Sequence, residues 1–212
     1  VAEAEGLTIV VTLTESQRVR CIEISATSGG DGSATVLDVA VGAFVDMAGN
    51  PNLPSTNFLN VEIEDSSLPS ITSAEIFLGT GILQVTADET IDVTPTTYVN
   101  QTGLIIDNFA TPNSGASRWI RLGGAQIPFG KKDGLVFTIQ MSESQRVLAI
   151  ALSGTPGGDN LAALLDVDQG AVRDVAGNFV AIDSNNAMTE HADSIIPVVE
   201  SARVNYSTGI VI

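Results

Sequence analysis

The chain repeats itself at long range. Residues 1–84 align without a gap on residues 129–212, an offset of 128 positions, and 33 of the 84 pairs are identical. The strongest block is Glu-Ser-Gln-Arg-Val, at positions 15–19 and again at 143–147. Self-similarity at a fixed long period is typical of tandem arrays, in which each period folds as one structural unit. The sequence therefore has to build one unit of 128 residues and parts of two others.

The boundary between periods is predicted at Pro69 and Pro197, where an acidic, polar stretch gives way to an extended apolar run. With this phase, residues 1–68 are the C-terminal part of one repeat and residues 69–196 are a complete repeat. Residues 197–212 are then the N-terminal strands of the next repeat. We expect the incomplete parts to be completed by neighbouring chain or by a neighbouring molecule.

Short apolar segments between turn residues predict an all-β fold. The 20 Gly and 8 Pro fall between these segments, and hydrophobic residues make up 44% of the chain but aromatic residues only 5%. The core must therefore consist of Val, Ile, Leu and Ala, as is common in sheets. Leu83, Val85 and Ala87 alternate with polar residues, which predicts a strand over residues 82–91. Further strands are expected over residues 103–107, 117–122, 135–141, 164–167 and 171–173.

Each repeat is also expected to contain one short helix. Thr14 to Gln17 and Ser142 to Gln145 have the pattern of a capping box, in which the first and fourth residues bond each other's backbone. Gly-Gly pairs at 29–30 and 157–158 would end the two helices. Short strands, frequent turns and a single short helix together predict a β-sandwich in each repeat.

The charge of the chain excludes some partners. There are 25 acidic and 9 basic residues, for a formal net charge of −16. A surface this negative repels nucleic acid and anionic membranes, and no apolar run approaches the ~18 residues of a membrane-spanning helix. A saline extracellular setting would screen the self-repulsion. Cys21 has no second cysteine to pair with, and we expect it to be a small buried residue.

Two segments resemble a known family of modules. They read Leu-Asp-Val-x-x-Gly-Ala-x-x-Asp-x-Ala-Gly-Asn, at 37–50 and 165–178, and Thr-Ala-Asp-Glu-Thr-Ile-Asp-x-Thr-Pro, at 86–95. They are similar to the tandem Ig-like repeats of prokaryotic cell-surface proteins, most closely those in surface-layer proteins of marine ammonia-oxidising archaea. Related modules occur in extracellular filaments and adhesins. The resemblance implies tandem Ig-like β-sandwich repeats in a cell-surface lattice or fibre, and it supplies no catalytic residues.

The Asp-x-Ala-Gly-Asn segment has two interpretations. Its oxygen-bearing side chains would suit a hard cation such as calcium, but they are too few for six to eight ligands. The preferred interpretation is a tight turn, in which the aspartate accepts backbone N–H bonds and the glycine is left-handed. The turn residues in the two copies are Asp46, Gly49, Asn50, Asp174, Gly177 and Asn178.

The better candidates for a metal site are acidic residues at the junctions between repeats. Carboxylates from two neighbouring repeats could share a calcium ion and stiffen the linker. Solvated linker charge is the alternative interpretation. The candidate ligands are Glu62, Glu64, Asp65, Glu190 and Asp193.

Arg18 and Arg146 recur in the first turn of the two predicted helices. A structural salt bridge to a neighbouring carboxylate, such as Asp38 or Asp166, is the favoured role of each arginine, ahead of ligand binding.

Two glycosylation sequons begin at Asn100 and Asn205, and they are consistent with export.

The sequence does not predict an enzyme. His191 is the single histidine, and the other repeat has Ile63 in its place. A catalytic triad or a zinc site would need partners that no motif provides. Trp119 is the single tryptophan, whereas a sugar-cleaving cleft is expected to offer several aromatic faces.

Two functions follow as hypotheses. The first is a structural, self-assembling subunit of an extracellular surface layer or filament, in which modules stack and share strands or edges. Its partner is the chain itself, with no nucleic acid and no membrane insertion, and calcium is the expected cation. The alternative is an adhesin repeat that binds glycans or a host surface through a loop over residues 108–117.

Overall fold

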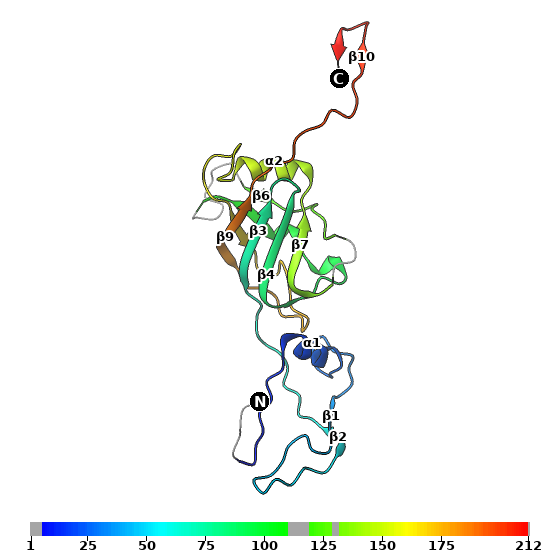
Figure 1. Ribbon diagram of the computed structural model, residues 1–212. Helices are drawn as coiled ribbons and strands as arrows, with labels where there is room; N and C mark the ends of the chain where they lie inside the picture. Colours follow the sequence, from blue (N-terminus) through cyan, green and yellow to red (C-terminus); the bar gives the residue numbers. More distant parts are fainter. Residues whose placement is uncertain (1–5, 110–118, 129–131, 212) are drawn as a thin grey trace.

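The computed structural model describes residues 6–109, 119–128 and 132–211, which form three parts in succession (Figure 1). Residues 6–68 correspond to about half of one repeat and are called the N-terminal half. Residues 69–196 form the central module, and residues 204–211 form the C-terminal hairpin. The N-terminal half and the hairpin lie at opposite ends of the central module. The N-terminal half contains α1 (Glu15–Glu23), β1 (Val36–Val39) and β2 (Ser55–Leu59). The hairpin consists of β10 (Val204–Asn205) and β11 (Ile210–Val211).

The central module is a seven-stranded sheet that curls around its own core. The strand order is β6-β5-β8-β9-β3-β4-β7, and every pairing is antiparallel except β3 with β9. Its strands are β3 (Ile71–Phe77), β4 (Ile82–Ile91), β5 (Leu104–Asp107), β6 (Ile120–Arg121), β7 (Gly134–Gln140), β8 (Leu164–Val167) and β9 (Asp183–His191). The helical elements are η1 (Thr96–Tyr98), η2 (Gln101–Gly103) and α2 (Glu143–Ala151). The described chain is thus rich in strands and poor in helix, with one curled mixed sheet.

The core of the central module is aliphatic, as the composition predicts. Ile76, Leu83, Val85 and Ile139 are fully buried and belong to one apolar cluster. The alternation in β4 places Leu83, Val85 and Ala87 in that cluster, and the strand has the predicted bounds. The strand expected over residues 171–173 is wrong, because this stretch contains a bend and, at Arg173, a single isolated bridge to Phe179. Residues 117 and 118 of another expected strand lie outside the described residues.

Both helices begin at the predicted capping boxes. Thr14 and Ser142 each accept a bond from the backbone of the glutamine three residues on, and that glutamine side chain accepts a bond from the cap backbone. Two N–H groups that the first helical turn leaves unpaired are satisfied in this way. The capping box therefore fixes where each helix starts.

The sequence repeat is also a repeat of structure. Displacing the chain by 128 positions carries α1 onto α2, β1 onto β8, and the start of β2 onto the start of β9. The pairing of Asn205 with Ile210 in the hairpin corresponds to the pairing of Phe77 with Ile82 between β3 and β4. The N-terminal half and the hairpin thus have the local structure of two different portions of the central module.

Equivalent residues of the two repeats differ in how far they are buried. Leu37 in β1 is 50% exposed, whereas its counterpart Leu165 in β8 is fully buried. Cys21 is exposed, so the expectation that it is a buried residue is wrong, although its counterpart Ala149 is fully buried. Positions that form the core in the central module therefore face solvent in the N-terminal half.

Candidate functional site

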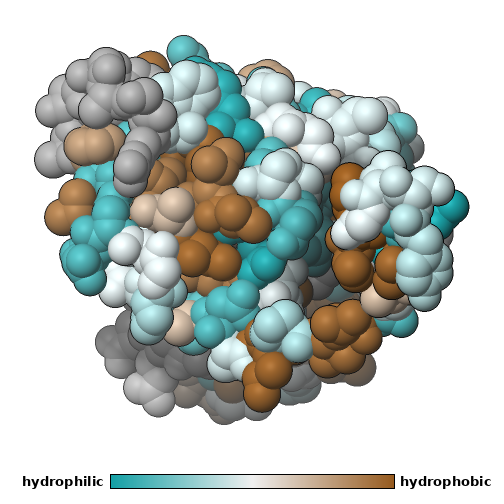
Figure 2. Space-filling view, turned by 90° about the horizontal axis from the view of Figure 1, so that it is seen from above, coloured by the Kyte–Doolittle hydropathy of each residue, from teal (hydrophilic) through white to brown (hydrophobic). Residues whose placement is uncertain are grey.

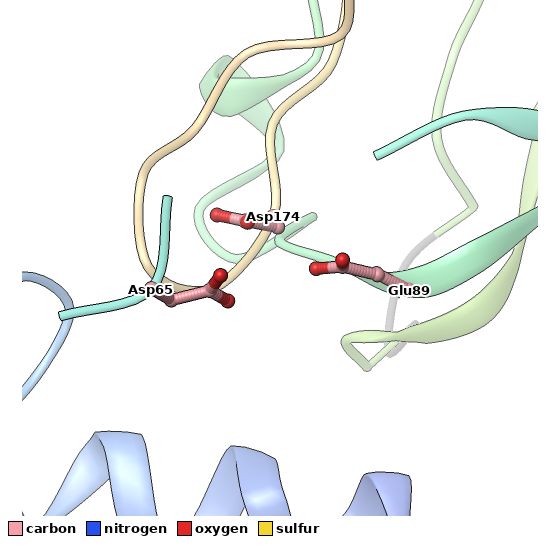
Figure 3. Close-up of side chains that lie close together, drawn as sticks. All are labelled: Asp65, Glu89 and Asp174. Carbon is pink, nitrogen blue, oxygen red and sulfur yellow. The ribbon is translucent and has the colours of Figure 1, made fainter. Parts of the chain in front are cut away.

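The candidate site lies where the N-terminal half meets the central module. Asp65 comes from the end of the N-terminal half, Glu89 from β4, and Asp174 from the Asp-x-Ala-Gly-Asn turn of the central module. One oxygen atom of each carboxylate lies within 4.8 Å of the others. Figure 3 shows the three side chains facing one another above the turns of α1. Three negative charges so close together repel one another unless a cation offsets them.

Arg18 of α1 supplies that positive charge. Its Nη1 donates to Asp65, its Nη2 lies 3.2 Å from Glu89 Oε2, and its Nε and Nη2 form a bidentate pair with Glu15 at 2.7 and 2.8 Å. Bidentate charge-assisted bonds hold a guanidinium in a fixed orientation. Arg18 therefore joins the helix, the linker and β4 in one network across the junction.

The network shifts the pKa of two carboxyl groups in opposite directions. The bond from Arg18, aided by the Thr90 N–H at 2.9 Å, lowers the pKa of Glu15 to about 2. Burial raises the pKa of Glu89, and the charge of Arg18 opposes that rise. Glu15 thus forms its bonds across the junction as a carboxylate.

The Asp-x-Ala-Gly-Asn turn of the central module is built into the same junction. Asp174 accepts from the backbone N and Nδ2 of Asn178 at 2.8 and 3.0 Å, and Gly177 is left-handed with φ +93°. Nδ2 of Asn178 also donates to the Asp65 carbonyl at 3.2 Å. Next to this turn lies Gly29, where a Cβ atom would stand 2.1 Å from the Val175 carbonyl oxygen. The turn therefore serves as a docking element for the preceding repeat.

The same turn in the N-terminal half is formed but makes no such contact. Asp46 accepts from the backbone N and Nδ2 of Asn50 at 2.8 and 2.9 Å, and Gly49 has φ +84°. All three residues are exposed, and a Cβ atom at Gly49 would meet nothing within 4 Å. In both copies the asparagine of the turn donates to the aspartate through its backbone N and its Nδ2.

The donor set at the junction fits a metal poorly while Arg18 is in place. A hard cation such as calcium takes six to eight oxygen ligands. Asp65, Glu89 and Asp174 are the one such acidic group among the residues that the structure describes. Both Asp174 oxygens already accept bonds, and Asp65 and Glu89 are paired with Arg18. A cation would have to displace the guanidinium.

The five predicted metal ligands are not brought together. Glu62 accepts from the backbone N of Ala26 and Thr35 at 3.2 and 2.9 Å, which ties the loop after α1 to the chain before β1. Glu190 does the same in the central module, with Gly154 and Ala163 at 3.0 and 2.8 Å. Asp193 pairs with Arg146, Glu64 is exposed, and Asp65 alone belongs to the acidic group. Glu89 and Asp174 were not predicted as ligands, although both lie in the segments that carry the family resemblance.

The two recurrent arginines form salt bridges, but the expected partners are wrong. Arg146 pairs with Glu143 at 2.7 Å and with Asp193 at 2.8 Å, repeating the Arg18 contacts to Glu15 and Asp65 at the same spacing in the sequence. Asp38 and Asp166 instead accept backbone N–H bonds, from Asn57 and Asn185, at 2.8 and 2.7 Å. Each arginine therefore ties its helix to the linker that follows, and Arg18 also reaches Glu89 of β4.

The remaining candidate residues lie apart from the junction. Asn100 and Asn205 are exposed, and their side-chain oxygens accept bonds from Thr102 and Ser207 in local turns. His191 stacks on Phe77 with ring centroids 4.2 Å apart, and its Nε2 lies 2.9 Å from Glu75.

In the part of the chain that the structure describes, no helix is long and apolar enough to cross a membrane.

Comparison with protein-family models, curated proteins and solved structures finds no match to the chain.

Proposed function

We propose that the chain is a stretch of tandem Ig-like β-sandwich modules in a structural subunit of an extracellular surface layer or filament. In this role it carries no catalytic site, and its partner is further copies of the same module. The observation that carries the proposal is the junction network around Arg18, whose elements recur at Arg146.

The network suits a protein in which each module fixes the orientation of the next module. Arg18 is fixed within its own repeat by Glu15 and Asp65, and it reaches Glu89 of the following module. Arg146 is held in the same way by Glu143 and Asp193. The same junction can therefore form at each period, which sets one orientation between successive modules.

The charge of the chain supports an extracellular, saline setting. A net charge of −16 makes neighbouring molecules repel one another at low salt. At the junction the repulsion is offset locally, because Arg18 is surrounded by carboxylates. Salt screening would reduce the repulsion that remains between exposed surfaces.

Electron microscopy of the 212-residue chain tests the proposal, at high salt with calcium and again with a chelator. Fibres or sheets with an axial repeat set by the modules are the expected result. If the fibres or sheets survive chelation, Arg18 alone holds the junction together. If they are lost on chelation, a cation bound by Asp65, Glu89 and Asp174 is needed. Dispersed single particles in both conditions would contradict the structural role.

The described residues do not test the adhesin alternative. Its expected loop covers residues 108–117, of which residues 110–117 lie outside the described residues. It stays a prediction.

A further inference from the structure

A short surface turn of the central module carries the first of the two sequons. Residues 100–102 lie between Val99 and Leu104, which are buried in the apolar cluster. Gly103 is also buried and packs closely, since a Cβ atom there would stand 2.9 Å from the Cβ of Ala171. Because both ends of the stretch are fixed in the core, the three residues between them turn at the surface.

Hydrogen bonds fix the shape of this turn. Asn100 N donates to the Ala171 carbonyl at 2.8 Å, and Gly103 N donates to the Asn100 carbonyl at 2.9 Å. The side chain of Asn100 caps η2, since its Oδ1 accepts from Thr102 N at 3.2 Å and from Thr102 Oγ1 at 2.5 Å. Both Asn100 and Thr102 are exposed. The asparagine and the hydroxyl of the sequon are therefore presented together at the surface.

The amide nitrogen of Asn100 is the atom that the turn leaves free. A carboxamide has one acceptor oxygen and one nitrogen with two N–H groups. The two bonds from Thr102 use the oxygen, and among the described residues no hydrogen bond uses Nδ2. N-linked glycosylation attaches a sugar to this nitrogen in an Asn-x-Ser/Thr sequon. The atom that would react is thus the one without a bond.

The second sequon has a different setting. Asn205 lies in β10 and pairs with Ile210, and its counterpart Phe77 pairs with neighbours on both sides in the central module. An asparagine within a strand has to break the bonds of the sheet before it can enter the active site of a transferase. A turn at the surface presents its side chain outside any sheet, so the fold favours Asn100.

The surface next to the turn is polar. Arg121 Nη1 donates to the Thr102 carbonyl at 2.7 Å and pairs with Asp168 at 2.9 Å. The two paired side chains are 40% and 48% exposed, so the ion pair is in contact with water. A hydrophilic glycan at Asn100 would therefore extend from a surface that is already hydrated.

The turn also lies away from the apolar patches at the hairpin end of the molecule. β5, which follows the turn, runs in the same direction as β3, because β5 and β9 are both antiparallel to β8 and β9 is parallel to β3. The turn is thus at the end of the central module where β3 begins. Figure 2, viewed from the hairpin end, shows apolar side chains in several patches on that opposite face.

We propose that Asn100 carries an N-linked glycan, which an oligosaccharyltransferase adds after export. The inference rests on the extracellular location in the proposed function. In the transfer, Asn100 Nδ2 forms a bond to the anomeric carbon of a polyprenyl-linked sugar donor, and the bond from that carbon to the phosphate oxygen breaks. The polyprenyl-linked phosphate leaves with the electron pair, and the proton lost from Nδ2 passes to water. The amide remains uncharged.

Transfer to the purified, folded chain tests the proposal. The 212-residue chain with Asn205→Gln, which removes the second sequon, is incubated with a single-subunit oligosaccharyltransferase and a polyprenyl-linked oligosaccharide. Mass spectrometry of the peptides should find the glycan on Asn100. Thr102→Val, which replaces the hydroxyl by a methyl group of similar size, should abolish transfer, and Thr102→Ser, which keeps the hydroxyl, should retain it.

A matched sequon within a strand serves as the control for accessibility. Ala187→Thr changes residues 185–187 of β9 to Asn-Asn-Thr, in a strand that pairs with β3 and β8. The backbone N of Asn185 also donates to Asp166 at 2.7 Å. The folded chain should therefore receive several-fold less glycan at Asn185 than at Asn100.

The outcomes separate this inference from the proposed function. Transfer to a synthetic peptide of residues 96–104, but not to Asn100 of the folded chain, overturns the inference, and so does equal transfer to the strand sequon. The assay needs no assembly. Transfer to Asn100 in a chain that stays as dispersed particles would keep the modification and remove the structural role. Fibres or sheets of a chain that accepts no glycan would do the reverse.

Discussion

The N-terminal half and the central module share a sequence pattern but differ in their cores. Leu37 and Leu165 occupy the same place in β1 and β8, and the first is half exposed while the second is fully buried. Both copies nevertheless form the capped helix, the strand and the Asp-x-Ala-Gly-Asn turn. Local hydrogen bonds thus form these elements in both places, whereas burial depends on strands from outside the segment.

This difference decides where the folding free energy comes from. Burying apolar surface contributes about 25 cal/mol per Å², so a residue contributes through what covers it and not through its type alone. The central module buries its aliphatic side chains in one cluster. The N-terminal half leaves Ile9, Val11 and Phe58 largely exposed, and it is stabilised by turns, caps and ion pairs. Matched substitutions in the two copies should separate these contributions.

The largest difference is expected for a leucine in the core. Leu165→Ala should lower the free energy of unfolding of the central module by about 2–5 kcal/mol, because it leaves a cavity in a packed core. Leu37→Ala should cost less than about 0.5 kcal/mol, as exposed substitutions do. Urea denaturation measures both changes, followed by fluorescence of Trp119 for the central module and by hydrogen exchange of the β1 amides for the N-terminal half. Equal losses would mean that Leu37 is covered in solution.

The next effect concerns the two left-handed glycines after the helices. Gly29 and Gly157 have φ +84° and +97°, so alanine at either position should cost about 1–2 kcal/mol in backbone strain. Only at Gly29 would the new methyl group also meet the Val175 carbonyl of the next module. Small-angle scattering should show a changed interdomain distance distribution for Gly29→Ala. It should show none for Gly157→Ala, and a change in both would contradict the assignment of this contact to the junction.

A smaller effect is expected from the arginine network. Arg18 reaches Glu89 across the junction, and a double-mutant cycle with Arg18→Gln and Glu89→Gln should give a coupling of about 0.5–1 kcal/mol. The matched cycle with Arg146→Gln in place of Arg18→Gln should give no coupling, since the described contacts of Arg146 do not include Glu89. Differential denaturation at low salt measures both couplings. A coupling of the same size in the two cycles would contradict a specific ion pair between Arg18 and Glu89 across the junction.

The last prediction concerns a titration at the junction. The pKa of Glu15 is lowered from 4.5 to about 2. The contribution of its carboxylate to the stability of the junction is therefore complete above pH 4.5 and is lost as the pH falls toward 2. The pKa of Glu89 is raised, so its protonation acts in the opposite sense and favours the junction as the pH falls. The Thr90 amide donates to Glu15, and its NMR shift should titrate with a midpoint near 2. A midpoint near 4.5, or a titration that survives in Glu15→Gln, would exclude this bond.

The elements with a local signal could be predicted from the sequence. The strand over residues 82–91 follows from strict alternation, and the helix starts follow from two capping boxes. Strand β9 was missed because Asp183–His191 is largely polar and shows no apolar alternation, and it forms through pairing with β3 and β8.

The candidate site could be predicted only in part. The recurrence of Arg18 and Arg146 indicated a structural ion pair, but each linker partner lies 47 positions further along the chain. Such a distance gives no periodic signal, so the sequence does not indicate Asp65 and Asp193 as the partners. Glu89 and Asp174 join Asp65 through packing of two repeats, which no spacing within one repeat contains.

The Glu62 carboxylate has a consequence for the conformational entropy of the segment between α1 and β1. By accepting from the backbone N of Ala26 and of Thr35, it closes residues 26–35 into a loop, as Glu190 does with Gly154 and Ala163 in the central module. A loop whose two ends are held together has less conformational entropy left to lose when the strand that follows it pairs. A single glutamate, repeated once per period, therefore lowers the entropic cost of ordering the chain between helix and strand in each repeat.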